Sequence, residues 1–594
     1  MSFFEDASLV MIPSGVKESK LYSIKPTDGT GDFTFTRGTD TATRVNSAGN
    51  IEKETQNLLL QSNQFNTTWT LNNASVTGGQ SGYDGSNDAW ELDVTTAAGH
   101  LQQSLTAVSG VHTISLYAKQ GTLDFLMIYA RDAGGSNDAE FYFDLANGVT
   151  GSTKGANPIT LKMTDVGGGW YRCEGASKGG FDQYRIYGSN VDNSVTGTGN
   201  IYIQDAQLEQ GLVARTYIDT TTAAVYAGIT DNLPRLDYSG GASCPSLLLE
   251  SQRTNIQPNS EYVNAYTKSR STITTNATTS PEGVSNASKV IPLSTSTGWS
   301  GINAPNYSFT SGQTYTLSVF AKAGEYNYCQ VGGSTPAFNG SFATINLTNG
   351  VVEHESGITA STEDYGNGWY RISFTHTAIA TASSPIGFFA VYSTAVSSRL
   401  VAQVGDNVSG VYIFGWMAEL GSYPTSYIPT MGSAVTRSKE GAQVTSVSDL
   451  IGQTQGTLFA EVDSFGVGEV ANRILGVSNG SAAERVIILT RSNGYRFIVT
   501  NSSVNNVDYT NYTTTNGVHK LAMTYDANEV RIFVDGAKVT TDSSVTLPSS
   551  LNSVHIGKVE ITDSYNNNFG GSAKQALVFK TALTDAEAIA LTTL

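Results

Sequence analysis

Two polar runs in the last hundred residues combine aromatic rings with amides. The run NSSVNNVDYTNYTTTNG (501–517) holds Tyr509 and Tyr512, and the run DSYNNNFGGS (563–572) holds Tyr565 and Phe569. Sugar-binding sites use this mixture of an aromatic face with amide and carboxylate hydrogen-bonding groups. We therefore treat these four side chains as candidate glycan contacts. An ordinary solvated loop, or a contact between subunits, is the alternative interpretation of the same composition.

Four of the six tryptophans can be assigned, one as a candidate contact and three as expected core residues. Trp299 lies in a polar, turn-rich run, STSTGWSGINAP, where the fold does not require a large aromatic. It either binds a ligand or fills the surface. Trp90, Trp170 and Trp369 alternate with other residues in strand-like runs, so we expect them to pack inward.

No catalytic signature is present in the sequence. H-E-x-x-H and phosphate-loop strings are absent. G-x-S-x-G occurs at 175–179 and at 476–480, but no helical pattern follows either string, as a catalytic serine elbow requires. No Ser/His/Asp or Cys/His arrangement has a recognisable local pattern. A glycosidase needs two carboxylates roughly 5–10 Å apart across a cleft, and no motif singles out such a pair. We therefore expect that the protein is not an enzyme and that it needs no catalytic cofactor.

Composition limits the partners that the chain can bind. Its 594 residues suffice for about four domains. With 34 Lys and Arg against 51 Asp and Glu, the net charge is −17, which argues against binding nucleic acid through a basic patch. Only 14% of residues are charged, so Ser, Thr, Asn and Gly must fill the surface. That surface suits short strands and turns better than helices.

The cysteines and the N-terminus indicate where the chain is assembled. Cys173, Cys244 and Cys329 are too few for a disulfide framework and fit a reducing cytoplasm. No run of about 18 apolar residues occurs, so we expect no membrane insertion. The opening residues, with Glu5 and Asp6, lack the basic and long apolar regions of a secretory signal.

Period-two alternation dominates the chain. Examples are GDFTFTRG, VHTISLYAK, YTLSVFAK, KLAMTYD and VRIFVDG, and such patterns predict half-buried antiparallel strands. Asn-Gly or Asp-Gly pairs join several of these runs, which is the strongest short signal for a hairpin. Only LTDAEAIALTTL (583–594) looks helical, with Thr584 as an N-cap. The sequence therefore predicts an all-β protein with a short C-terminal helix.

The chain also repeats itself. Matched strings recur in the same order, which indicates a duplicated domain of about 160–180 residues. The clearest pairs are VHTISLYAKQG with TYTLSVFAKAG, DVGGGWYRCEGA with DYGNGWYRISFT, and IYIQDAQLEQG with VYIFGWMAELG. Short strands at this spacing predict tandem jelly rolls or β-sandwiches. We expect five segments: 1–57, jelly-roll copy 1 at 58–218, connecting strands at 219–250, jelly-roll copy 2 at 251–442, and a third sandwich at 443–594.

Three sets of strings resemble known families. HKLAMTYDANEVRIFVDGAKV, followed by IGK and ALVFKTALTDAEAIAL, resembles the laminin-G-like or concanavalin-A-like lectin fold. The duplicated unit, with its AKxG and GWYR strands, resembles the jelly rolls of carbohydrate-binding modules. DFTFTRG, TATRVNSAGNIE, DNLPRLDYSGGASCPSLLLESQRTN and TSYIPTMGSAVTR resemble segments shared by tail-fibre and head-fibre proteins of double-stranded DNA phages.

The phage resemblance implies a virion fibre or spike protein. It would assemble in the host cytoplasm as a homotrimer, join capsid or tail proteins through its N-terminus, and bind a host-surface glycan or other receptor. The resemblance to jelly rolls adds a structural calcium, with Asp205 as its candidate ligand, although copy 2 has Gly415 there. The alternatives are a bacterial glycan-binding accessory protein, or a depolymerase with an unrecognised active site.

The resemblance also implies an architecture. Residues 1–57 and about 219–250 should form one discontinuous platform, with copy 1 as an outgrowth. Residues 1–57, with Phe33 and Phe35, are too few to bury their own strands, so we expect them to attach to a partner subunit or to the virion. Chain order would then place residues 443–594 farthest out, as the host-facing part.

Overall fold

The computed structural model describes residues 3–132, 134, 138–295, 297–465, 473–491, 494–513, 516–557 and 569–594, with the backbone alone at 511–513. Strands dominate these residues, which confirms the predicted all-β class. The helices are α1 (Phe3–Asp6), α2 (Asp585–Thr592) and the short 3₁₀ turns η1 (Ser239–Gly241), η2 (Val263–Ala265) and η3 (Ser448–Leu450). Thr584 is the N-cap of α2, as the sequence predicts. Its side chain accepts a hydrogen bond from the Glu587 N–H, and the Glu587 side chain accepts one from the Thr584 N–H. None of the helices in the described ranges has the length and apolar character needed to cross a membrane.

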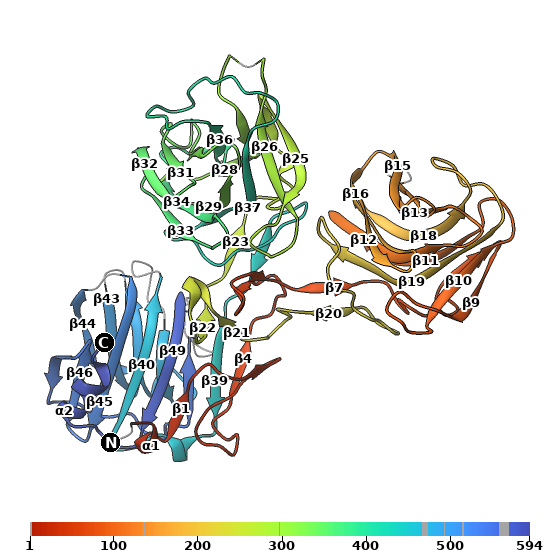
Figure 1. Ribbon diagram of the computed structural model, residues 1–594. Helices are drawn as coiled ribbons and strands as arrows, with labels where there is room; N and C mark the ends of the chain where they lie inside the picture. Colours follow the sequence, from red (N-terminus) through yellow and green to blue (C-terminus); the bar gives the residue numbers. More distant parts are fainter. Residues whose placement is uncertain are drawn as a thin grey trace.

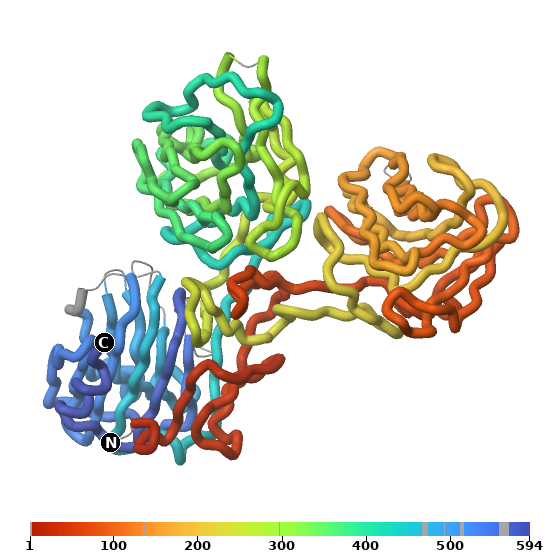
Figure 2. The backbone as a smooth tube through the Cα atoms, in the orientation of Figure 1, coloured from red at the N-terminus to blue at the C-terminus, as the bar shows by residue number. Residues whose placement is uncertain are grey.

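Three β-sandwich bodies make up the molecule (Figure 1). We call residues 58–218 lobe 1, residues 251–434 lobe 2, and the body that holds both chain termini the sandwich. A stem, residues 37–57 and 219–234, joins them. Its pairs are β5 (Arg44–Val45) with β6 (Ile51–Glu52), and β7 (Thr55–Asn57) with β20 (Val225–Ala227). Figure 2 shows two segments running out to lobe 1, one red-orange, from before the lobe in sequence, and one yellow, from directly after it.

Lobes 1 and 2 have the same strand order, which supports the duplication seen in the sequence. The first sheet of lobe 1 contains β16 (Pro158–Gly167), β17 (Trp170–Lys178), β12 (Val111–Gln120), β19 (Gly199–Gln210), β10 (Ala89–Val94) and β9 (Ala74–Gln80). The second contains β15 (Val149–Gly155), β14 (Ala139–Asp144), β13 (Phe125–Asp132), β18 (Phe181–Ser189), β11 (His100–Val108) and β8 (Thr70–Asn72).

Lobe 2 repeats both sheets in the same order. The first contains β33 (Ala360–Asp364), β34 (Trp369–Thr377), β29 (Thr314–Ala323), β37 (Val411–Leu420), β26 (Ala287–Pro292) and β25 (Ser271–Thr278). The second contains β32 (Val351–Ser356), β31 (Phe342–Asn346), β30 (Tyr328–Gly332), β36 (Phe388–Tyr392), β27 (Gly301–Asn303) and β24 (Thr267–Ser269). The hairpin β28 (Asn306–Phe309) with β35 (Ala382–Pro385), and the pair β23 (Arg253–Asn255) with β38 (Val435–Arg437), lie outside these sheets. Trp90, Trp170 and Trp369 are all buried, as predicted.

The sandwich is built from both ends of the chain. One sheet contains β21 (Arg235–Asp237), β22 (Ser246–Leu249), β49 (Gly571–Phe579), β40 (Gly456–Ser464), β45 (Gly517–Asp526), β46 (Glu529–Val534) and β47 (Ala537–Asp542), with β1 (Leu9–Met11) also on β49. The other contains β2 (Val16–Lys17), β3 (Lys20–Leu21), β4 (Phe33–Thr36), β39 (Gly441–Thr445), β48 (Ser553–Ile556), β41 (Arg473–Ser478), β42 (Arg485–Arg491), β43 (Gly494–Asn501) and β44 (Val504–Thr513).

The N-terminal strands find their partner inside the same chain. Leu9 pairs with Val578 on β49, and Phe35 pairs with Ala442 on β39. Phe33 and Phe35 are fully buried in the sandwich core. The expectation that residues 443–594 lie farthest from the N-terminus is therefore wrong, because both ends of the chain belong to one body (Figure 2).

A buried network of three arginines and two glutamates joins the stem, the sandwich and lobe 2. Glu440 binds Arg37 at 3.0 Å and also binds Arg235, and Glu250 accepts from Arg235 and from Arg437 at 2.8 Å each. All five side chains are at most 1% exposed. Burial opposes ionisation of Glu250, but Arg437 and Arg235 outweigh it and hold its pKa at about 2. We call this network the hub.

Phe35→Ala tests the role of the N-terminal strands. The substitution should lower the free energy of unfolding of the sandwich by about 3–5 kcal/mol, because a ring buried in the core is replaced by a cavity. Urea unfolding of the full chain measures the change. Thr34→Ala, on the exposed face of the same strand, should stay within about 0.5 kcal/mol of the original chain. Equal, small effects of both variants would contradict the assignment.

Glu440→Gln tests the hub. It leaves Arg37 and Arg235 buried without their shared carboxylate, so the sandwich should lose about 3–5 kcal/mol of stability. Glu529→Gln is the matched control, because Glu529 pairs with Arg531 at the surface at 2.9 Å. An exposed pair of this kind contributes at most about 1 kcal/mol. Thermal unfolding of both variants compares them; a harmless Glu440→Gln would show that the hub does not hold the platform together.

Candidate functional site

The outer face of the second sheet of lobe 1 carries aromatic and charged side chains in a row. Alternation along β13 sends Leu126, Ile128 and Ala130 into the core, which leaves Tyr129 on the outside. In the same way β18 turns Ile186 inward. The remaining outward side chains belong to β14, β18 and β11. We call the set the lobe 1 face: His100, Gln102, Tyr129, Glu140, Tyr142, Arg185 and Tyr187.

Cation–π and hydrogen-bonding contacts hold the centre of the lobe 1 face in place. The Arg185 guanidinium lies 5.2 Å from the centre of the Tyr129 ring. Its Nη1 donates to the Tyr187 hydroxyl at 3.3 Å, and the Tyr187 ring packs against His100 with centroids 4.6 Å apart. Tyr129 donates its hydroxyl to Asp138. Burial raises the pKa of Tyr129, and this hydrogen bond raises it further, so the phenol stays neutral.

The lobe 1 face is partly accessible. Tyr129, Arg185, His100 and Gln102 are half-buried, whereas Tyr142 is buried beneath Lys154, whose ammonium lies 5.7 Å from the ring centre. Tyr187 is 6% exposed and packs with Tyr142 and Val195, so the half-buried Tyr129 and His100 rings give the accessible apolar surface. The guanidinium, amide and carboxylate groups give donors and acceptors beside it. This arrangement can bind a polyhydroxylated ligand by stacking together with hydrogen bonds.

The corresponding face of lobe 2 is covered by its own loop. Leu400 donates its backbone N–H to Gln330 Oε1 at 2.7 Å, and Thr344 donates to the Val396 carbonyl at 2.8 Å. Tyr392 donates to the Val401 carbonyl at 3.2 Å. The loop, residues 393–410, is longer than its counterpart in lobe 1, residues 190–198. It places apolar side chains over the sheet.

The register of the two sheets explains why the faces differ. Tyr129 lies opposite Arg185 in lobe 1, and Gly332 lies opposite Phe388 at the same place in lobe 2. Phe388 is 1% exposed. In lobe 2 a buried phenylalanine under the loop, with the Arg399 guanidinium 4.9 Å from its ring centre, thus takes the place of the half-buried Tyr129–Arg185 pair, so the aromatic ring at this place is more accessible in lobe 1.

Most residues chosen from the sequence do not form a site. Phe569 is 1% exposed in the sandwich core, so its interpretation as a contact is wrong: it is a core aromatic in a polar run. Tyr509 is half-buried against the same core. Tyr565 and the Tyr512 side chain lie outside the described residues. Trp299 packs against Phe388, with ring centroids 6.1 Å apart, in the covered face of lobe 2.

Asp205 occupies a bulge in β19 that recurs in lobe 2. Its φ is 55°, and Gly415 at the equivalent bulge in β37 has φ 61°. Tyr83 donates to Asp205 Oδ2 at 3.0 Å. Burial raises the pKa of Asp205 to about 6, against the hydrogen bond from Tyr83. Within the described ranges no three His, Cys, Asp or Glu side chains gather closely enough to hold a metal.

Asp205→Asn should stabilise lobe 1 at pH 7. Because the pKa of Asp205 is raised above its unfolded value, the folded chain binds the proton more tightly and loses stability as pH rises from about 4 to about 6. Asn keeps the acceptor for Tyr83 and tolerates the left-handed backbone. The gain should reach at most about 3 kcal/mol at pH 7 and vanish near pH 4. Urea unfolding at both pH values measures it, with Asp93→Asn as control; calcium that stabilises only the original chain would contradict the prediction.

The lobe 1 face was missed from the sequence because Tyr129 and Arg185 alternate with core residues in ordinary strands. The duplication could have revealed this face. Aligning the two copies places Tyr129 at the position of Gly332, so the shared fold does not require the tyrosine.

Comparison with known proteins identifies part of the sandwich. Residues 438–589 match the family model of the concanavalin A-like lectin/glucanases superfamily. No curated protein matches the chain.

Similar solved structures include the CBM40 domain of the Ruminococcus gnavus IT-sialidase bound to α2,3-sialyllactose (18% identity, 24% of this chain and 84% of that one, TM-score 0.22). Another is domain 4 of the Geobacillus stearothermophilus arabinanase AbnA with arabinotriose (14% identity, 26% and 73%, TM-score 0.22). A third is a putative carbohydrate binding protein of Bacteroides ovatus (12% identity, 48% and 83%, TM-score 0.19). These similarities are too low to assign a ligand to this chain, whereas the family match gives its C-terminal body a lectin-like fold.

Proposed function

We propose that this chain is a non-enzymatic surface protein of a phage virion that uses its lectin-like bodies to attach to host glycans. The observation that carries the glycan-binding part is the contrast between the two lobes. The same sheet leaves Tyr129 and Arg185 half-buried at the surface in lobe 1 and is covered by residues 393–410 in lobe 2. Because the two lobes share one fold, side chains that differ between them at the same position are not required by that fold and are candidates for binding.

The virion part of the proposal rests on the strings shared with phage fibre proteins. The structure changes how attachment would work, because the strands of residues 9–36 are part of the sandwich. We therefore propose that the sandwich faces the particle and that lobes 1 and 2 project from it on the stem. Assembly as a homotrimer belongs to the same proposal, and each trimer would present three lobe 1 faces, so that weak binding at each adds up through avidity.

Replacing Tyr129 and Arg185 together by Ala tests the glycan-binding role. The variant removes one stacking ring and its guanidinium partner, so binding of the full chain to glycans on an array should weaken about tenfold or more. Tyr412→Ala is the matched control, because Tyr412 forms a cation–π pair with Lys289 at 5.7 Å on lobe 2, away from this face. Circular dichroism checks that both variants fold. Unchanged glycan binding by the double variant would refute the assignment of the lobe 1 face.

A further inference from the structure

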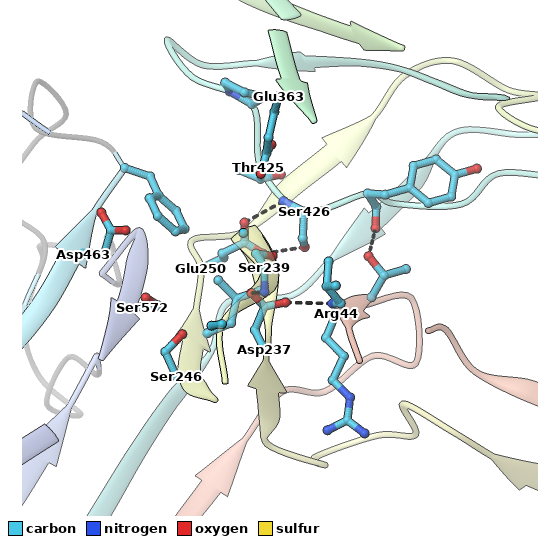
Figure 3. Close-up of a pocket in the computed structure, with 18 of the residues that line it drawn as sticks. Arg44, Asp237, Ser239, Ser246, Glu250, Glu363, Thr425, Ser426, Asp463 and Ser572 are labelled. Atoms are coloured by element: carbon cyan, nitrogen blue, oxygen red, sulfur yellow. Dashed lines mark hydrogen bonds between the residues drawn. The ribbon is translucent and has the colours of Figure 1, made fainter. Parts of the chain in front are cut away.

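A cavity of about 700 Å³ lies where the sandwich, lobe 2 and the β21–β22 hairpin meet (Figure 3). Asp463 and Ser572 reach it from the sandwich strands β40 and β49. Glu363 reaches it from β33 of lobe 2. The hairpin adds hydroxyl groups between them, from Ser239 and Ser246. Its volume is typical of a pocket for a small ligand.

Two carboxyl groups in the cavity wall have unused hydrogen-bonding capacity. Within the described part of the chain, neither the Glu363 nor the Asp463 side chain has a hydrogen bond or an ion pair. Glu363 is exposed and Asp463 is half-buried; desolvation by the surrounding wall raises the pKa of both groups. Arg371 opposes the rise at Glu363, and Lys574 opposes it at Asp463. Both carboxyls are therefore acceptors that the protein itself does not use.

A buried cation in the same wall is also incompletely paired. Arg371 is 6% exposed, and its Nη2 donates to Ser318 Oγ at 3.0 Å and to the Thr425 carbonyl at 2.6 Å. Its Nε–H has no acceptor among the described residues. Arg172 in lobe 1 makes the equivalent two hydrogen bonds, to Ser115 Oγ and to the Arg215 carbonyl, and its Nε–H likewise has no acceptor in the part of the chain that the structure describes, so this arginine geometry belongs to the shared fold. What Arg371 contributes to the cavity is its positive charge in the wall.

Comparing the two lobes again shows which side chains in the cavity wall the shared fold does not require. Arg371 lies opposite Glu363 in lobe 2, and at the same register Arg172 lies opposite Thr164 in lobe 1. Lobe 1 thus has the arginine but a neutral residue in place of the acid. The carboxyl is present only in the copy whose sheet borders the cavity.

The wall chemistry selects the class of ligand. A cation would meet Arg371 and Lys574, and an anion would meet Glu363 and Asp463. A neutral sugar satisfies both sets, because each hydroxyl can donate to a carboxylate and accept from a cation. Tyr365, Tyr423 and Phe465 supply rings on which its C–H face can stack, a geometry common to sugar sites.

We propose that this cavity is a second saccharide site, which takes a neutral mono- to trisaccharide unit between the sandwich and lobe 2. The inference extends the proposed glycan binding to a place distinct from the lobe 1 face. A sugar bound here bridges two bodies of the chain and fixes their relative orientation.

Cys244 offers a direct test of occupancy. It is exposed and lines the cavity, whereas Cys173 and Cys329 are buried, so a maleimide should react first at Cys244. The full chain is alkylated in the presence of a panel of neutral di- and trisaccharides, with calcium and sialyllactose as charged probes. At about ten times Kd, a sugar that binds should slow the reaction of Cys244 about tenfold.

The variant pair Glu363→Gln with Asp463→Asn should abolish this protection. Asp364→Asn is the matched control, because it lies next to Glu363 and Asn keeps the acceptor for the Gly366 N–H. The inference is overturned if the double variant is still protected by the sugar. It is also overturned if none of the neutral sugars protects Cys244 in the original chain. Protection by a charged probe alone overturns it as well. The variant Tyr129→Ala with Arg185→Ala should keep the protection, so failure of the lobe 1 face and failure of the cavity are distinguishable.

Discussion

The structure depends on burying five charged side chains together in its interior. Glu440 is shared by Arg37 and Arg235, and Glu250 by Arg235 and Arg437. Each of these charges would be prohibitively costly alone, so none can be buried before the others arrive. Because the five residues come from three distant parts of the chain, the hub couples the N-terminal segment, the β21–β22 hairpin and the exit from lobe 2. Their joint placement positions both lobes relative to the sandwich.

The two lobes show what a fold fixes and what it leaves free. Both keep the same strand order and the same left-handed bulge, occupied by Asp205 in one and by Gly415 in the other. Their outer sheet faces have diverged, one to a polar aromatic row and the other to an apolar surface under a long loop. The core of a jelly roll constrains only alternate residues, which leaves the outward half of each strand free to change.

Local pattern predicted the parts of the structure that local forces decide. The alternation around Trp170 and Trp369 and the cap at Thr584 were sufficient, since each signal lies within a few residues. Phe35 was assigned to a strand correctly, but its partner Ala442 lies across most of the chain, and no local signal names it. The prediction for Phe569 was wrong because its sequence neighbours are polar, which indicates an exposed loop, whereas its ring packs in the sandwich core.

The pairing of β1 with β49 has a consequence for how the protein is made. The ribosome releases the N-terminal strands long before their partners β39 and β49 exist, so Phe33 and Phe35 remain without a core until those strands have been made. A product cut short by premature termination can fold its lobes, since each has its own core, but it lacks the strands that shield these rings. The exposed rings would mark it for chaperones or proteases. Shielding of Phe33 and Phe35 thus depends on the later synthesis of β39 and β49, so these rings are hidden only once the sandwich strands from both parts of the chain have met.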